Sequence, residues 1–469
     1  PHDRYANAEA VIHALNDATE FDIPHESIEI RESYLQAAKF MGRELEMTEL
    51  RQAINNVIDN KGSAWLIGGE SGVGKSRLVS EIRTLSLVKG ALVLDGQAIA
   101  EGGLSYQLWL NPLRRLALSI DLQDAEAGVL KQILPDIGQL LGREIPDAPV
   151  LEGEAGQQRL LDTISQMFLE YEQPIVLFLE DIQWVDESLD VFKAMVEQLE
   201  NEPVLMIATF RSDERPTLPD ELEGVNVLML DRLADNHIAD LSVSILGEGG
   251  RDKSIIDFLN RETEGNVFFL VEVIRALAEN AGELSSIQSM KLPTHIFASG
   301  IQQVVERRLA QVPDAAKKLL QTAALAGRQL DLSILKHIAV DFDVEQWLTD
   351  CANVAVLEGI DGQWRFSHEK LREGIIESLP IDILQQQHHQ IAESMVDVYS
   401  DLHDEYASLI SDHFEQAQDA DKAAHWHLIA GKHAQDTFAP ATGIEHYRKA
   451  LRYWADKKDS PETISKLIT

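Results

Sequence analysis

Eight residues in the first fifth of the chain have the types and spacing of a phosphate-binding loop. The pattern GxxxxGK(S/T) occurs over 69–76, between an apolar run at 64–67 and an amphipathic stretch at 77–82. Glycines let successive backbone N–H groups turn toward phosphate oxygens, and a helix starting there adds partial positive charge. Lys75 is expected to reach the β- and γ-phosphates, and the Ser76 hydroxyl to bind Mg²⁺. The predicted nucleotide contacts in this segment are Gly69, Glu70, Ser71, Gly72, Val73, Gly74, Lys75, Ser76 and Arg77.

Two adjacent acids follow a strongly apolar run further along the chain. Residues 175–179 are apolar throughout and lead into Glu180 and Asp181, which predicts a central strand buried on both faces. Ligands of open α/β sheets bind at the carboxyl ends of the strands. Both acids are therefore candidates to support Mg²⁺ and to polarise the attacking water. Arg211 follows another apolar run, 204–209, and is expected to sense a γ-phosphate.

These residues need a scaffold that brings strand ends together. Apolar runs that alternate with helical patterns predict a five-stranded parallel sheet in a doubly wound α/β core. After residue 234 the pattern becomes helical, and alternating residues around Asp361-Gly362 predict a hairpin. The expected domains are a possible end of a protein kinase domain at 1–18, a linker at 19–38, a nucleotide-binding domain at 39–232, a helical lid at 233–292, a winged-helix domain at 293–395 and tetratricopeptide-like helical repeats at 396–469.

The composition of the chain argues against several classes of function. The net charge of −37 argues against binding to nucleic acid or to an anionic membrane, since no basic cluster offsets it. The single cysteine, Cys351, excludes an internal disulfide and fits a reducing cytoplasm. No apolar run reaches transmembrane length and no signal peptide opens the chain. The chain begins at Pro1 rather than Met, so it is expected to be part of a longer protein.

From about Phe40 onward, this combination resembles the STAND class of signal-transduction ATPases, in the AAA-like form of multidomain bacterial regulators. Met41-Gly42-Arg43-Glu44 resembles the family's V-G-R-E motif, which contacts adenine, with Met in place of Val. Leu179-Glu180-Asp181 resembles its Walker B pair. Asp often comes first in that pair, so the order here leaves open which acid supports Mg²⁺ and which acts as base. Phe210-Arg211 resembles the sensor arginine after the fourth strand.

Two further motifs resemble those of the same class. Gly265-Asn266-Val267 resembles the G-x-P motif, with Val267 in place of the proline that packs on adenine. Phe366-Ser367-His368 resembles the winged-helix segment whose histidine touches the β-phosphate of ADP in the resting state. From the residues alone, Ser367 is a helix N-cap and His368 an ordinary helix-start residue. Residues 1–18 resemble the final subdomain of bacterial Ser/Thr protein kinases.

The resemblance implies an ATP/ADP switch with Mg²⁺ as cofactor. ADP would bridge core, lid and winged helix, and a signal sensed by the C-terminal repeats would permit ATP binding, opening and self-association. Slow hydrolysis would reset the switch. The leading hypothesis is the ATPase module of a Ser/Thr kinase fusion. The alternatives are a LuxR-type transcription regulator with a DNA-binding domain beyond Thr469, a winged helix that binds DNA directly, and a scaffold without turnover.

Overall fold

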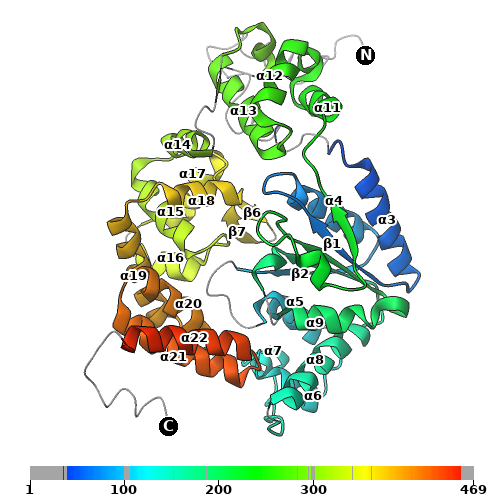
Figure 1. Ribbon diagram of the computed structural model, residues 1–469, viewed down its shortest axis with the longest axis vertical. Helices are drawn as coiled ribbons and strands as arrows, with labels where there is room; N and C mark the ends of the chain where they lie inside the picture. The colour runs from blue at the N-terminus through cyan, green and yellow to red at the C-terminus, as the bar shows by residue number, and fades with distance from the viewer. Residues whose placement is uncertain are drawn as a thin grey trace, which may run out of the picture. The chain divides into compact units, whose positions relative to one another are not determined.

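The computed structural model divides the chain into two compact units, which are described one at a time (Figure 1). The first comprises Pro1–Gly42, Arg232–Lys317 and Asp343–Gly374, and the second comprises Arg43–Asp231, Lys318–Phe342 and Ile375–Thr469. The structure describes residues 35, 40–99, 106–151, 153–185, 188–282, 284–293, 295–296, 301–340, 342–360 and 362–455. The kinase-like segment 1–18 and, except for Leu35, the linker 19–38 lie outside these residues, and the predicted domain boundaries stay predictions. Within the described part of the chain, none of the helices combines the length and the apolar character needed to cross a bilayer.

Five parallel strands of the second unit form one sheet in the order β2-β3-β4-β1-β5. All six residues of β4 are buried, as are the first five of β3, which is typical of parallel strands covered on both faces. This confirms the predicted five-stranded parallel sheet of a P-loop-like core, followed by helical regions. The strands are β1 (Ser63–Gly68), β2 (Leu92–Gln97), β3 (Ile175–Glu180), β4 (Val204–Thr209) and β5 (Asn226–Met229).

The helices of this core bury large side chains against the sheet. Trp109 and Phe168 meet edge to face with their ring centroids 5.9 Å apart, and the Trp109 Nε1–H donates to the Ser188 carbonyl at 2.9 Å. Buried rings of this kind contribute about 0.5–1.5 kcal/mol beyond their area. The helices are α3 (Glu44–Ile58), α4 (Lys75–Val88), α5 (Gln107–Ala117), α6 (Asp124–Leu130), α7 (Ile137–Leu141), α8 (Gly153–Leu169), α9 (Ser188–Val196) and α10 (Leu218–Glu221), with short 3₁₀ helices η1 (Ile182–Trp184) and η2 (Leu199–Asn201).

Among its described residues, the regular structure of the first unit is helical apart from one hairpin. Strands β6 (Leu357–Ile360) and β7 (Gln363–Phe366) pair antiparallel, which confirms the hairpin predicted from the Asp-Gly signal. The helices that contribute to this unit are α11 (Asp235–Leu246), α12 (Lys253–Thr263), α13 (Val267–Ala281), α14 (Ile301–Gln311), α15 (Asp314–Ala326), α17 (Val344–Asn353) and α18 (Glu369–Glu377), with 3₁₀ helices η3 (Gly247–Arg251) and η4 (Leu284–Ser289).

A buried ion triad holds three of these elements together. The Glu272 carboxylate on α13 pairs with Arg275 on the same helix and with Arg308 on α14. Arg308 Nη1 also donates to the carbonyls of Val354 at 2.7 Å and Ala355 at 2.8 Å, just before β6. Burial alone would raise the pKa of Glu272, but the two guanidinium groups lower it to about 2. The triad therefore fixes α13 to α14 and to the start of the hairpin.

The C-terminal part of the second unit is a stack of antiparallel helices. Gly431 of α21 leaves room for the Tyr447 ring of α22, because a Cβ atom at Gly431 would come within 2.7 Å of that ring. In the turn between α21 and α22, Phe438 packs on Gly156 of α8, and its carbonyl accepts the Tyr106 hydroxyl at 3.2 Å. The helices are α16 (Leu332–Ile338), α19 (Ile381–Val398), α20 (His403–Gln416), α21 (Ala420–Asp436) and α22 (Pro440–Ala455).

Candidate functional site

The predicted phosphate-binding loop lies between β1 and α4. Gly69, Gly72 and Gly74 have φ angles of +151°, +87° and +104°, in the region that favours glycine. At Gly69 a Cβ atom would also come within 2.6 Å of the Leu230 carbonyl oxygen, so the loop has no room for a side chain there. Gly74 is the N-cap of α4, so the loop leads directly into a helix N-terminus, where the first N–H groups have no partners within the helix. The cradle fits a phosphate group.

Lys75 is held over this loop. Its ammonium group donates to the carbonyls of Gly69 at 2.6 Å and Glu70 at 2.9 Å. Burial lowers the pKa of Lys75 from 10.5 to about 8; Asp181 raises it and Arg211 lowers it, so both groups are close to the ammonium. Ser76 is exposed on the first turn of α4, and its hydroxyl is a suitable Mg²⁺ ligand.

The affinity for ADP is expected to fall as the pH rises through about 8, the pKa of Lys75. Below this pH the free protein carries the ammonium that attracts phosphate, whereas above it binding must first take up a proton. The dissociation constant should rise by up to about tenfold per pH unit above the pKa. Calorimetric titration with ADP at several pH values measures this slope. Lys75→Gln should bind ADP weakly, and its dissociation constant should not show this pH dependence. A flat wild-type profile up to about pH 9 would contradict the assigned pKa.

Asp181 lies at the carboxyl end of β3, among basic groups. Its backbone adopts a left-handed φ of +60°, and its N–H donates to the Thr209 hydroxyl at 3.1 Å. One carboxylate oxygen lies 3.7 Å from Arg211 Nε and the other 3.2 Å from Arg328 Nη1. Gln183 lies beneath, and its side-chain oxygen accepts the Arg211 N–H at 3.1 Å. The structure thus brings together Asp181 and Arg211, which were predicted separately.

Glu180 has different surroundings from Asp181. It is the last residue of β3 and pairs in register with Gln97 of β2. Asp95 also lies on β2, and burial raises the pKa of its carboxyl group. The Arg83 charge opposes this rise in pKa, and the Glu180 charge adds to it. The two adjacent acids therefore lie in separate electrostatic environments, one beside Asp95 and Arg83, the other beside two arginines. Which of them supports Mg²⁺ stays a prediction.

Arg211 is fixed as well as buried. Its Nη1 lies 2.7 Å from a Glu214 carboxylate oxygen, and its guanidinium lies over the Trp184 ring, 4.9 Å from the centroid. The Trp184 Nε1–H donates to the other Glu214 oxygen at 2.6 Å. Held from two sides, the guanidinium stays at the edge of the sheet where Lys75 and Asp181 lie.

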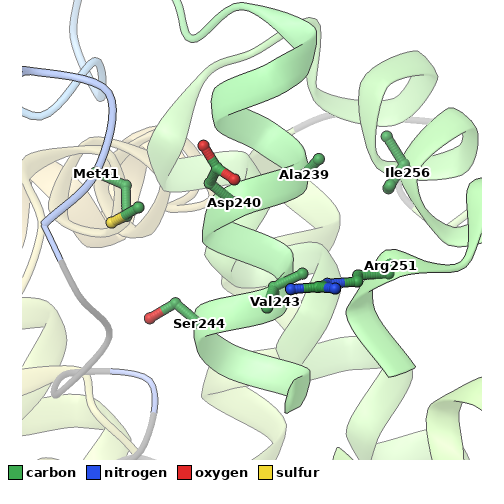
Figure 2. Close-up of a pocket in the computed structure, with 7 residues that line it drawn as sticks. All are labelled: Met41, Ala239, Asp240, Val243, Ser244, Arg251 and Ile256. Carbon is green, nitrogen blue, oxygen red and sulfur yellow. The ribbon is translucent and has the colours of Figure 1, made fainter. Parts of the chain in front are cut away.

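The Met41-Gly42-Arg43 motif supports the loop and borders a pocket. Arg43 donates through Nη2 to the Val73 carbonyl of the loop at 3.2 Å, and to the Asp231 carbonyl just after β5. Gly42 has a φ of +73°, and a Cβ atom there would come within 2.7 Å of the His237 ring. In the first unit, Met41 lies beside α11 at a pocket of about 640 Å³ (Figure 2). The pocket is lined by Met41, Ala239, Asp240, Val243, Ser244, Arg251 and Ile256.

The start of α13 and His368 come together in the first unit, although about a hundred residues separate them in sequence. Val267 is the first residue of α13, the helix position that best accommodates the proline it replaces. The next residue, Phe268, packs against His368, with ring centroids 4.0 Å apart. The N-cap prediction for Ser367 was wrong. His368 Nδ1 accepts the Lys370 N–H at 3.1 Å, whereas the Ser367 hydroxyl donates to the Ala355 carbonyl at 2.6 Å.

Three residues of the site had not been predicted from sequence. The Thr209 hydroxyl accepts the Asp181 N–H, and the Gln183 side chain accepts the Arg211 N–H. Thr209 ends one apolar run and Gln183 closely follows another, and these positions could have indicated that both residues belong to the site. Arg328 follows α15, 147 positions from Asp181, in a segment with no motif of its own. No local pattern could have linked it to the sheet.

Part of the chain matches a known protein family. Residues 39–207 match the family described as AAA ATPase domain. An uncharacterized protein of Rhizobium meliloti (strain 1021) is 25% identical over 338 residues, which cover 64% of this chain and 31% of that protein. The chain thus spans about a third of the length of this curated relative. The residues from Met41 to Asp181 that were predicted to bind nucleotide lie within this match, and a match to the AAA ATPase domain implies ATP binding and nucleoside triphosphate hydrolysis.

Two of the similar solved structures come from Pyrococcus species. The chain is similar to a Signal Transduction ATPase with Numerous Domains (STAND) protein with a tetratricopeptide repeat sensor from Pyrococcus horikoshii, with 15% identity and a TM-score of 0.45 over 91% of this chain and 65% of that one. It is also similar to the Walker-type ATPase of Pyrococcus abyssi, with 12% identity and a TM-score of 0.32 over 72% of this chain and 96% of that one.

Proposed function

We propose that this chain is the nucleotide-controlled switch of a multidomain signalling protein, a STAND-class ATPase whose slow hydrolysis resets the switch. The main support for this proposal is that Lys75, Asp181 and Arg211 lie close together at the carboxyl edge of the parallel sheet. Lys75 and the loop N–H groups bind the phosphates, and Arg211 responds to the γ-phosphate. Ser76 and one of the two acids hold Mg²⁺, which offsets phosphate charge, and the other acid orients water.

The resting state is proposed to depend on ADP. Support comes from the first unit, where the start of α13 and His368 lie together. Since Nδ1 accepts the Lys370 N–H, the neutral ring carries its proton on Nε2, which can donate to a phosphate oxygen. ADP and ATP can shift the switch only through a difference in affinity for its two states. His368 on the β-phosphate and Arg211 near the γ-phosphate supply that difference.

Purified protein is expected to carry bound ADP, and His368→Ala to weaken ADP binding by about tenfold, the effect of one lost hydrogen bond to a charged group. Chromatography of the released nucleotide and calorimetric titration measure these two quantities. Well-folded protein that binds neither ADP nor ATP would overturn the proposal.

Two variants separate phosphate binding from helix capping. His368→Asn keeps a side-chain oxygen that can accept the Lys370 N–H but is too short to replace the imidazole at a phosphate. It should therefore lose ADP affinity as His368→Ala does. If His368→Asn instead binds ADP as tightly as wild type, the role of His368 would be to cap α18 and not to bind phosphate. His295→Ala, at an exposed histidine of the same unit, should leave the affinity unchanged.

The parent protein is proposed to be a Ser/Thr kinase fusion in the cytoplasm, on the resemblance of residues 1–18 to the end of a kinase domain. The C-terminal helices are the proposed sensor for a signalling protein or ligand, and self-association accompanies opening. The alternative is a transcription regulator of the LuxR type. The full-length gene distinguishes the two: kinase motifs before Pro1 support the first, and a basic helix-turn-helix after Thr469 supports the second.

A further inference from the structure

Arg328 reaches the acid of the nucleotide site from a segment outside the sheet core. It follows α15 in the second unit, and its Nη1 lies 3.2 Å from Asp181 Oδ2. The side chains are 15% and 8% exposed, so water screens this ion pair only in part. Arg211 Nε lies 3.7 Å from the other oxygen of the same carboxylate. Two guanidinium groups therefore flank the acid in this conformation.

The backbone beside Arg328 is connected to the C-terminal helices. Three residues later, Asp331 caps α16, with Oδ1 accepting the N–H groups of Ser333 at 3.0 Å and Ile334 at 3.2 Å. Its Oδ2 accepts a hydrogen bond from the hydroxyl of Tyr399, the C-cap residue directly after α19. Burial and the Asp331 carboxylate raise the pKa of Tyr399, so this hydroxyl keeps its proton at neutral pH.

Tyr399 is itself fixed by the next helix. Its ring stacks on Tyr406 of α20, with centroids 3.8 Å apart and planes 3° from parallel. Leu325 on α15 and Ile334 on α16 share one buried core with residues of α19, α20 and α21. A displacement of α19 and α20 would therefore be transmitted through Tyr399 and Asp331 to the segment that carries Arg328.

An arginine at this position opposes Mg²⁺ binding by Asp181. Mg²⁺ requires oxygen ligands in near-octahedral geometry and is commonly held by one or two carboxylates together with phosphates. The Arg328 guanidinium already engages Asp181 Oδ2 and carries charge of the same sign as Mg²⁺. With Asp181 taken as the acid that would hold Mg²⁺, Arg328 and Mg²⁺ would compete for the same carboxylate.

We propose that Arg328 is a positioning residue that restrains the ATPase: it holds Asp181 in an ion pair until movement of α19 and α20 withdraws it. This inference rests on the proposed function, since it presupposes nucleotide turnover at Lys75 and Asp181. It adds an inhibitory contact within the chain and a route by which the C-terminal helices relieve it. No chemical step is assigned to Arg328 itself.

The test measures ATP turnover and Mg²⁺-dependent ADP binding by the whole chain over a range of Mg²⁺ concentrations. Arg328→Gln should lower the Mg²⁺ concentration needed for half-maximal turnover by about tenfold and raise turnover at limiting Mg²⁺, because a competing cation is removed. Lys336→Gln, at an exposed lysine on α16, should change neither. A loss of turnover in Arg328→Gln would make Arg328 a catalytic arginine, and an unchanged Mg²⁺ requirement would make the ion pair structural. Either result overturns the inference.

A second variant tests the link to the C-terminal helices. Tyr399→Phe removes the hydroxyl from Asp331 but keeps the ring on Tyr406, and it should shift the Mg²⁺ requirement in the same direction by a smaller factor. Combined with Arg328→Gln it should add nothing, because both changes act through one contact. Additive effects would refute the link.

Failure of the proposed function gives a different result from failure of this inference. If wild type and Lys75→Ala are equally inactive, ATP turnover is absent and the proposed function is wrong. The Mg²⁺ dependence of ADP binding then still decides on Arg328: an equal dependence in wild type and Arg328→Gln refutes it.

Discussion

Lys75→Ala is expected to reduce ATP hydrolysis by about 10²–10³-fold, the usual effect of removing one preorganised group that stabilises developing negative charge. The ammonium is already placed, because Nζ is bonded to the carbonyls of Gly69 and Glu70 at the rim of the loop. Lys75 is the one basic residue in the loop at 69–76, so no other side chain of the loop can supply positive charge in its place. Phosphate release at saturating ATP measures the loss.

The same helix offers a matched control. Lys89 is exposed at the C-terminal end of α4, so Lys89→Ala removes an equal charge without touching the loop. Its turnover should stay within about twofold of wild type, since surface substitutions have small effects. Turnover in Lys75→Ala above about a tenth of wild type would show that this lysine does not have the role assigned to it.

Glu272→Gln is expected to lower the free energy of unfolding by about 3–5 kcal/mol, because it leaves two buried guanidinium groups without a counter-charge. The exposed fractions of the three side chains are 6% for Glu272, 9% for Arg275 and 5% for Arg308, so solvent cannot take over this role. Urea denaturation measures the change. Glu279→Gln, on the same helix, breaks the partly exposed pair with Arg307 and should lower the free energy of unfolding by only about 0–1 kcal/mol.

The pH dependence of stability tests the same triad. The pKa of Glu272 is lowered from 4.5 in the unfolded chain to about 2 in the folded protein. Its stabilising contribution is therefore fully present above about pH 4.5 and is lost as the pH falls toward 2. In Glu272→Gln this part of the acid dependence should disappear. Equal loss of stability on acidification in both proteins would show that the triad is not the source.

Local signals predicted the sheet and much of the nucleotide site. The loop at 69–76 was recognisable because its chemistry requires glycines and a lysine at fixed spacing. Strand β3 was recognisable because its first five residues are all apolar, as expected of a strand buried on both faces. Asp181 and Arg211 could be paired because parallel strands end at one edge of a sheet. These inferences needed only neighbouring residues and the topology of the fold.

Contacts that depend on distant elements were beyond sequence reasoning. The pairing of Arg328 with Asp181 is set by how α15 and α16 pack, which no short pattern encodes. Ser367 has the composition of an N-cap, but its hydroxyl is drawn to the Ala355 carbonyl and His368 takes its place. The roles assigned to the site residues at the nucleotide, including Glu180, Val267 and His368, remain predictions.

The contact of Phe438 with Gly156 and Tyr106 has a consequence for the order in which the protein is built. Tyr106 and Phe438 are 332 positions apart, and the contact closes a very long loop. During synthesis all five strands have left the ribosome well before Phe438 is translated. The nascent sheet domain therefore presents an uncovered α8 surface until Phe438 has been translated. Docking of the last helices completes this surface as a late event, and a chain stalled before Phe438 would keep it open.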